Sequence, residues 1–398
     1  HSLKPYPFKF AATAKTTLSY RRFKAQDISM NLFPYPTCMY LQKFTIFIIT
    51  LIASHCMADS PATRPDTEAN NAVRASIVIG ESLKNKTAPE PGELDSPFGV
   101  AFDAKSNMYI VELSGGRVHR RDTHGVLTLI AGDGSKGYQG DTGPAAAATF
   151  NGMHNVAATR DGDLYIADSW NHCVRKIDTQ TGIITTIAGT GKAGFSGDGG
   201  PASAATFNFL MCVSLNPAED KLYVADLKNR RIRMIDLESK VVITVAGNGK
   251  KGIPLDGSDA TTSPLVDPRA VAVDSKNNVY ILERSGHALR RVSPAGEIHT
   301  VAGTGQSGNA VGKALETQFN SPKHLAIDQA DNVIVADDQN ARVVRYEPKQ
   351  NTVTSILGKG VKHPKRGLLR PHGICIHGDG SIYIVDTGHH RILRLQLN

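Results

Sequence analysis

One short motif decides the fold, because the chain repeats it as YIVE at 109–112, YIAD at 165–168, YVAD at 223–226, YILE at 280–283, IVAD at 334–337 and YIVD at 383–386. The closing acids lie 56, 58, 57, 54 and 49 residues apart. A period of this length indicates an architecture in which each unit packs against its neighbours. We therefore expect six copies of one unit between residues 96 and 398.

Within each unit the apolar residues alternate with period 2, as in strands. The second unit has four such stretches, at 156–158, 164–166, 174–177 and 184–187, with Asp161-Gly162 and Thr181-Gly182 where turns are needed. A single four-stranded sheet buries too little apolar surface, so such sheets pack face to face around an axis. The pattern predicts an all-β, six-bladed β-propeller of four-stranded antiparallel blades.

The two ends of the repeat region complement each other. The last unit stops at Leu395-Gln396-Leu397-Asn398, after its third strand. Upstream of the first unit, Ser76-Ile77-Val78-Ile79-Gly80 resembles the fourth strands that end in Ala188-Gly189 and Ala246-Gly247. We expect the N-terminal strand to complete the last blade, which would remove two exposed edges and close the ring.

The segment before the repeats is typical of an export signal. Met39 and Lys43 precede an apolar run from Phe44 to Ala53, which is too short to span a bilayer, and Ala58 is a suitable cleavage residue. We expect an over-translated or artefactual leader at 1–38, a signal peptide at 39–58, a linker at 59–74 and the propeller at 75–398. A lipid on Cys56 is the competing interpretation.

Charge and cysteine content narrow the function classes. Of the net charge of +8, residues 1–58 contribute seven Lys and Arg against one Asp, which leaves a net charge of +2 for the rest. Without a long basic block we expect no nucleic-acid partner. Cys173, Cys212 and Cys375 fall in different repeats, so we expect small buried hydrophobes rather than disulfides.

The units resemble NHL repeats. Asp168-Ser169-Trp170-Asn171-His172, the run from Asp226 to Arg233 and the run from Asp386 to Ile392 are similar to that family's D-x-x-N-x-R-I pattern. The loop from Ala188 to Ala202 is similar to the inter-blade loop of bacterial exported NHL proteins. The resemblance implies a propeller and, most often, a binding role. Some NHL domains bind RNA, others are extracellular sensors, and a minority are enzymes.

Two recurring features are interpreted as structural. The acid that closes each second strand recurs at equivalent places in six units, whereas an active site uses unlike residues, so we expect these acids to cap turns through backbone N–H groups. The Gly-rich loops around Asp133, Asp141 and Asp198 lack the ligand spacing of a calcium loop and the Gly-Lys-Ser/Thr of a P-loop, and are interpreted as turns.

A more informative column is the start of each innermost strand, which should face the mouth of the central channel. Its occupants, called the mouth ring from here on, are Phe98, His154, Met211, Arg269, Lys323 and His372. Two imidazoles and two cations at one opening suit an anion or metal pocket, and the alternative is a set of ordinary polar residues around a water-filled channel. Trp170, the only Trp, is a further ligand-binding candidate or a packing residue.

The mouth ring also tests two enzyme classes. Peptide-amidating lyases are similar propellers that hold zinc with His in three alternate blades, and the corresponding residues here are His154, Arg269 and His372, whose Arg would repel a metal. A calcium-dependent lactonase would need Glu, Asn and Asp there, and the mouth ring contains none.

We therefore predict a binding or scaffold module for a protein, peptide or glycan of the cell envelope, without a metal or other cofactor. It would be secreted, periplasmic or held at the envelope, with membrane contact only through the signal peptide or a lipid. The alternative is a propeller enzyme, a lyase or hydrolase, acting on an anionic substrate at the mouth.

Overall fold

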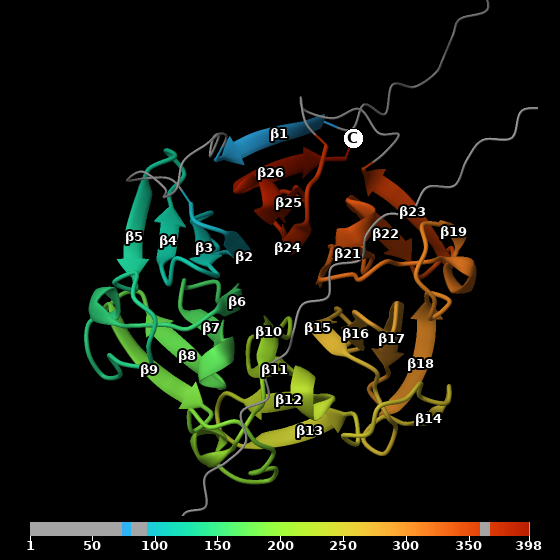
Figure 1. The fold of residues 1–398 in the computed structure, drawn as a ribbon, viewed down its shortest axis with the longest axis horizontal. Coiled ribbons are helices and arrows are strands. Elements are labelled where there is room, and N and C mark those ends of the chain that lie inside the picture. Colours follow the sequence, from blue (N-terminus) through green and yellow to red (C-terminus); the bar gives the residue numbers. More distant parts are fainter. Residues whose placement is uncertain (1–73, 81–93, 359–366, 398) are drawn as a thin grey trace, which may run out of the picture. The chain divides into compact units, whose positions relative to one another are not determined.

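A computed structural model describes residues 74–80, 94–358 and 367–397. The leader, the export signal with Cys38 and Cys56, and most of the linker lie outside the described residues. In the described part, six antiparallel sheets are arranged around a central axis (Figure 1), which confirms the predicted six-bladed propeller. No helix in these three ranges is long and apolar enough to cross a membrane.

Each blade has four main strands, named here from the axis outward. The innermost strands are β2 (Pro97–Phe102), β6 (Met153–Ala158), β10 (Leu210–Leu215), β15 (Pro268–Val273), β20 (His324–Ile327) and β24 (Pro371–Ile376). The second strands are β3 (Met108–Glu112), β7 (Leu164–Asp168), β11 (Lys221–Asp226), β16 (Val279–Glu283), β21 (Val333–Asp337) and β25 (Ile382–Asp386).

The third strands are β4 (Val118–Arg121), β8 (Cys173–Asp178), β12 (Arg231–Asp236), β17 (Ala288–Val292), β22 (Arg342–Glu347) and β26 (Arg391–Gln396). The outermost strands are β5 (Leu127–Ala131), β9 (Ile183–Ala188), β13 (Val242–Ala246), β18 (Glu297–Ala302), β23 (Thr352–Leu357) and, in the last blade, β1 (Arg74–Ile79). Two short strands, β14 (Ser258–Asp259) and β19 (Gly312–Lys313), pair with β18 and β23.

Single 3-10 turns occur at two repeated places. Between blades lie η1 (Ala145–Ala147), η3 (Ala202–Ala204) and η5 (Ala314–Glu316). After second strands lie η2 (Ser169–Asn171), η4 (Leu227–Asn229), η6 (Asp338–Asn340) and η7 (Thr387–His389). The residue after each turn of this second set has a left-handed backbone, with φ between 48° and 55°. This conformation reverses the direction of the chain so that the third strand can begin.

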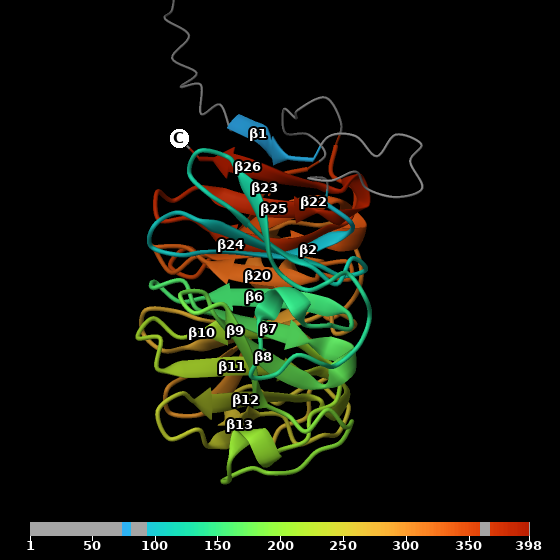
Figure 2. The same cartoon turned by 90° about the vertical axis from the view of Figure 1, so that its left-hand side faces the viewer.

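The ring closes as the sequence predicts. Strand β1 pairs antiparallel with β26, with Ile77 opposite Leu393 and Ile79 opposite Ile392. Figures 1 and 2 both show β1 alongside β26 at the outer edge of the last blade. Ile77 packs against the apolar cluster shared with blade five, while Val78 and Ile79 pack against the cluster shared with blade one. Strand β1 therefore contacts the blades on both sides of the last blade, which are blade five and blade one.

The core lies between the faces of neighbouring blades. The strands alternate as expected, so the side chains of Tyr165 and Ala167 pack toward blade three while those of Leu164 and Ile166 pack toward blade one. Phe150, Phe207 and Phe319 are each fully buried, and each lies in the loop a few residues before an innermost strand. Three inter-blade loops are thereby fixed by an aromatic side chain that enters the core.

Candidate functional site

The structure brings most of the mouth ring into direct contact. The Phe98 ring centroid lies 4.9 Å from that of His154 and 4.2 Å from that of His372, and the guanidinium carbon of Arg269 lies 5.7 Å from it. These side chains come from four different blades and each is the second residue of its innermost strand, so these strands direct equivalent residues toward one another. Met211, 4% exposed, occupies the equivalent place on β10. The role of the ring in ligand binding stays a prediction.

Asp338 belongs to the same site and was missed in the sequence. One of its carboxylate oxygens lies 3.6 Å from Lys323 Nζ, and the other lies 3.8 Å from His372 Nε2 and 3.6 Å from Arg370 Nε. It directly follows the acid that closes the second strand of blade five, Asp337. Reading the repeat alignment one position further would have found it, because Leu113, Ser169, Leu227, Arg284 and Thr387 hold the same place in the other units.

Burial sets the protonation of the mouth. Desolvation and the nearby charge of Arg269 lower the pKa of His154 to about 3 and that of His372 to about 2. Desolvation, reinforced by Arg269, lowers the pKa of Lys323 to about 8 despite the opposing charge of Asp338. At neutral pH both imidazoles are therefore uncharged, and the positive charge of the ring resides on Arg269 and Lys323.

Several polar atoms of the mouth lack partners. Within the described residues, Arg269 Nε, both ring nitrogens of His372 and one oxygen of Asp338 are buried without a hydrogen bond. Buried polar groups are nearly always satisfied, by protein, water or a ligand, so a set of unsatisfied ones at a single place calls for an explanation. An anion at the mouth would supply acceptors for the Arg269 guanidinium.

The acids that close the second strands are structural, as predicted, but their partners differ from those expected. Each accepts a hydrogen bond from a backbone N–H in the loop before the innermost strand of its own blade, for example from Asn151 to Asp168 at 2.8 Å and from Asn208 to Asp226 at 2.8 Å. The backbone partner lies 17 or 18 residues upstream, and in blades two, three and five the acid also accepts a hydrogen bond from the side-chain amide of the Asn three residues later, in the adjacent turn. The carboxylates therefore tie the innermost strand to the second strand.

Each of these acids is also paired with a cation from the third strand. Arg342 and Arg391 are the first residues of their third strands, and Arg117 lies just before its strand. Arg175, Arg233 and Arg290 are the third residues of their strands. Asp141 and Asp198 of the Gly-rich loops bind Arg175 and Arg233, at 2.9 Å and 2.7 Å. The loops thus use their aspartates as counter-ions, and no group of three His, Cys, Asp or Glu side chains suited to a metal occurs among the described residues.

Trp170 lies on η2 at the edge of the mouth. Its ring covers Gly152, where a Cβ would lie 2.5 Å from the indole, and its centroid is 6.0 Å from that of His154. It is nevertheless 36% exposed, and Lys136 Nζ lies 5.8 Å from its centroid. Trp170 therefore both packs on the start of β6, the innermost strand of its own blade, and presents indole surface beside the mouth ring.

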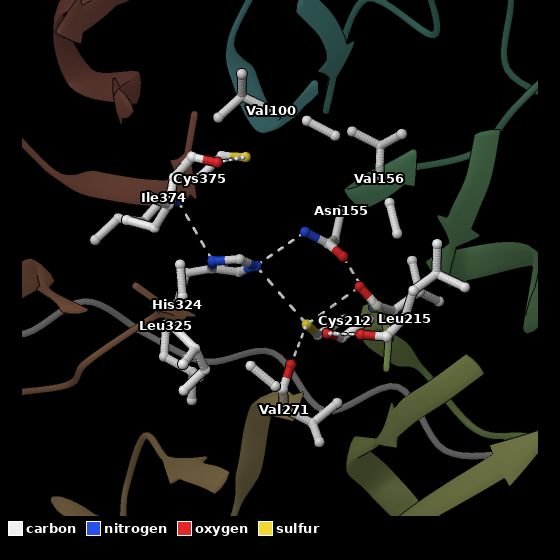
Figure 3. Close-up of a pocket in the computed structure, with 18 of the residues that line it drawn as sticks. Val100, Asn155, Val156, Cys212, Leu215, Val271, His324, Leu325, Ile374 and Cys375 are labelled. Carbon is white, nitrogen blue, oxygen red and sulfur yellow. Dashed lines mark hydrogen bonds between the residues drawn. The ribbon is translucent and has the colours of Figure 1, made fainter. Parts of the chain in front are cut away.

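Below the mouth ring the channel holds a cavity of about 260 Å3 that sequence reasoning did not identify. Its wall is mainly apolar, as with Val100, Val156, Val271 and Ile374, and three polar side chains meet inside it (Figure 3). His324 Nε2 lies 2.9 Å from Asn155 Nδ2 and 3.7 Å from Cys212 Sγ, while the backbone N–H of Ile374 donates to His324 Nδ1 at 3.3 Å.

The thiol of this cluster is not activated. Burial raises the pKa of Cys212 to about 11, and burial together with Arg269 lowers the pKa of His324 to about 4. Asn155 and Cys212 both contact the same ring nitrogen, so Asn155 does not orient the far side of the imidazole as a triad would require. A neutral thiol beside a neutral imidazole is a poor nucleophile, and the cluster supplies no catalytic set.

The three cysteines of the described ranges are free, as expected. Cys173 and Cys212 are buried like small hydrophobes. Cys375 is partly buried, because it packs against the apolar cluster between blades six and one and also lines the channel cavity.

Two family models match the chain. The NHL repeat matches residues 150–177 and 368–395, which belong to blades two and six, and the Teneurin NHL domain matches residues 213–311. NHL repeat-containing protein 2 of Gallus gallus is 24% identical over 362 residues, covering 80% of this chain and 49% of that protein. The chain spans at most about half the length of the curated relatives it matches.

Solved propellers share the fold at low identity. An auxiliary nutrient binding protein from Bacteroides ovatus has a TM-score of 0.59 and 13% identity, over 82% of this chain and 76% of that chain. A virginiamycin B lyase from Staphylococcus aureus has a TM-score of 0.51 and 13% identity, over 82% of this chain and all of that chain. One neighbour binds and the other is an enzyme, so the likeness defines the scaffold and leaves the chemistry to the site.

Proposed function

Because the chain belongs to the NHL-repeat family and forms a six-bladed propeller, we propose that it is a binding module whose mouth ring recognises an acidic group on a protein, peptide or glycan partner. The observation that carries the proposal is the buried Arg269 guanidinium, 4% exposed, with its Nε unpartnered beside Lys323. A desolvated cation binds an anion more strongly than an exposed one does, because water competes less.

The geometry favours an acidic group over a neutral one. Asp338 faces Arg269, Lys323 and Arg370, and the other nearby carboxylate, Asp267, is paired with Arg284, so the site keeps a net positive charge after the internal pairs are counted. Phe98 places an aromatic face against the Arg269 guanidinium, and Trp170 adds exposed indole at the edge. Aromatic surface next to a cation suits a partner that carries a carboxylate on an apolar or sugar frame.

The affinity of the mouth ring for an anion should depend on pH. Affinity for glucuronate or N-acetylglutamate should fall severalfold between pH 7 and about pH 9.5, because Lys323 must be protonated to attract the anion and burial lowers its pKa to about 8. Lys323→Met should bind about tenfold more weakly at pH 7, which corresponds to roughly 1.4 kcal/mol, and should lose this pH dependence. Calorimetric titration at constant ionic strength measures both.

Two variants control this experiment. Lys192→Met removes an exposed cation outside the mouth and should leave affinity and pH dependence unchanged. Trp170→Ala should spare the binding of small carboxylates but weaken the binding of a larger acidic glycan or peptide. An affinity that stays flat from pH 7 to about pH 9.5 in the wild-type protein would argue against Lys323 as an anion ligand.

The proposal includes export to the cell envelope. Its support is the pattern at 39–58, in which a charged residue, an apolar run and small Ala58 follow one another. Protein recovered from outside the cytoplasmic membrane should begin at Asp59 when its N-terminus is sequenced. Recovery of the chain with residues 39–58 still attached, in the cytoplasmic fraction alone, would overturn this part.

An enzyme acting on an anionic substrate is the second candidate. It is favoured by the cations Arg269 and Lys323 at the mouth, which would stabilise negative charge that develops on an anionic substrate. Mass spectrometry of the titrated ligand separates the two candidates, since a binding module returns the ligand unchanged.

A further inference from the structure

A second pocket lies on the same face, at the seam between blades three and four. It has a volume of about 180 Å3 and is lined by Lys228, Arg230, Lys251, Asp267 and Arg284 among others. Arg284 holds the position that Asp338 holds in blade five, and its charge acts on both Arg269 and Lys323. The pocket is therefore close to the mouth ring.

The charges of this pocket are not balanced. Asp267 is the one acid among its lining residues, and it accepts hydrogen bonds from Arg284 Nε at 2.9 Å and from Ser285 Oγ at 2.6 Å. Lys228, Arg230 and Lys251 form no ion pair with a carboxylate of the described residues, so four cations face one anion. Arg230 Nε is in addition buried without a hydrogen-bond partner there, which is unfavourable unless a ligand or water supplies an acceptor.

Comparison of the six seams shows that Arg230 is an exception to a repeated device. At the equivalent position, blades two, four and six have His172, His287 and His390. The Nδ1 atom of each accepts the backbone N–H of the next blade, from Phe209 at 3.0 Å, Ser321 at 3.3 Å and Ser96 at 3.1 Å respectively. We call these three residues the seam histidines.

An arginine cannot replace a seam histidine, because a guanidinium has no acceptor. The backbone N–H of Asp267, which takes the place of Phe209, Ser321 and Ser96 in blade four, reaches instead only the carboxylate of Glu283 at 3.4 Å. The two other seams without a histidine have the uncharged Gly116 and Ala341 at this position. Only at the seam between blades three and four does a cation occupy the position of the histidine, and this cation faces a cavity.

We propose that the pocket bounded by Lys228, Arg230, Lys251 and Arg284 binds a tetrahedral oxyanion, a phosphate or sulfate group carried by the ligand. This rests on the proposed function, since the ligand of the mouth ring would then carry a second anionic group at the neighbouring seam. A phosphate monoester, which is a dianion at neutral pH, matches the excess of three positive charges better than a single carboxylate does, and guanidinium groups bind phosphate and sulfate oxygens through paired N–H donors.

The test restores the seam histidine. In the full chain, Arg230→His removes the cation and supplies the acceptor that blades two, four and six use, so the fold should keep or gain thermal stability. Inorganic sulfate and inorganic phosphate are titrated by calorimetry at fixed ionic strength. Arg230→His should weaken anion binding at the seam pocket at least tenfold and leave binding at the mouth ring unchanged. Lys323→Met should weaken binding at the mouth ring and leave the seam pocket unchanged.

The outcomes separate the two proposals. If Arg230→His titrates like wild type, the oxyanion pocket is overturned, whatever happens at the mouth. If Lys323→Met has no effect but Arg230→His does, the mouth proposal fails and the pocket stands.

Discussion

Deletion of residues 74–80 is expected to lower the melting temperature of the full chain by on the order of 10 °C, the largest effect that we predict for a change outside the buried ion pairs. The segment supplies strand β1, the outermost strand of the last blade. Its loss removes the ladder with β26 and exposes the apolar surface that Ile77, Val78 and Ile79 cover. Partial burial of three aliphatic side chains contributes roughly 3–5 kcal/mol.

The deletion should also change the state of association. Without β1, the outer edge of β26 presents unpaired N–H and C=O groups, and an exposed edge of this kind pairs with another chain. We expect dimers or aggregates in light scattering well below the melting temperature. A control with Arg74→Ala and Ser76→Ala, the exposed side chains of the same strand, should melt like wild type. A deletion variant that melts unchanged and stays monomeric would contradict closure through β1.

Arg233→Met is expected to destabilise the protein by about 3–5 kcal/mol, because it leaves the fully buried Asp226 carboxylate, 4.0 Å from the guanidinium, without this cation. The Arg233 side chain is fully buried and donates to Asp198 at 2.7 Å and to the backbone carbonyls of Thr206 and Ser196, each at 3.0 Å. Its guanidinium also lies over the Phe207 ring at 4.6 Å. One residue thus connects the third strand of blade three to the loop from blade two.

The double variant Arg233→Met with Asp226→Asn provides the matched control. It removes the buried negative charge that Arg233→Met would leave behind but keeps an oxygen that accepts the Asn208 N–H, so we expect part of the lost stability to return. Lys192→Met, which removes an exposed cation, should have no measurable effect. Chemical denaturation compares the free energies of unfolding. A loss below about 1 kcal/mol for Arg233→Met would mean that the pair is not a main tie of the blade.

The architecture was predictable because the repeat carries it. Six copies of a period-2 unit define the blades, and the match of Ser76–Gly80 to the fourth strands identified the closing strand. The mouth ring could be predicted for the same reason, since equivalent positions in a ring face a common axis. A period-2 pattern, however, predicts the strands of each blade but not which side chains of neighbouring blades contact one another.

The channel cluster escaped prediction for a geometric reason. Strict alternation would turn Asn155 and Cys212 away from the axis, because His154 and Met211 already face it. The pairing registers shift between Met153 and Asn155 and between Leu210 and Cys212. Such a bulge turns consecutive residues toward the same side, and no residue type in these strands signals it.

The partners of the closing acids and the seam histidines escaped prediction because they are distant in sequence. Asp168 binds a backbone N–H 17 residues upstream, and His172 accepts one 37 residues downstream in the next blade. Only the positions of the blades reveal these contacts. Once they are known, the exception at Arg230 can be read directly from the repeat alignment.

Anomalous diffraction from crystals soaked in bromide locates the anion site of the protein. We expect a bromide ion in contact with the Arg269 guanidinium and the Lys323 ammonium at the mouth ring, and its loss in crystals of Arg269→Met. Bromide found only beside exposed surface lysines, with the mouth ring unoccupied at the same concentration, would show that the mouth ring is not an anion site.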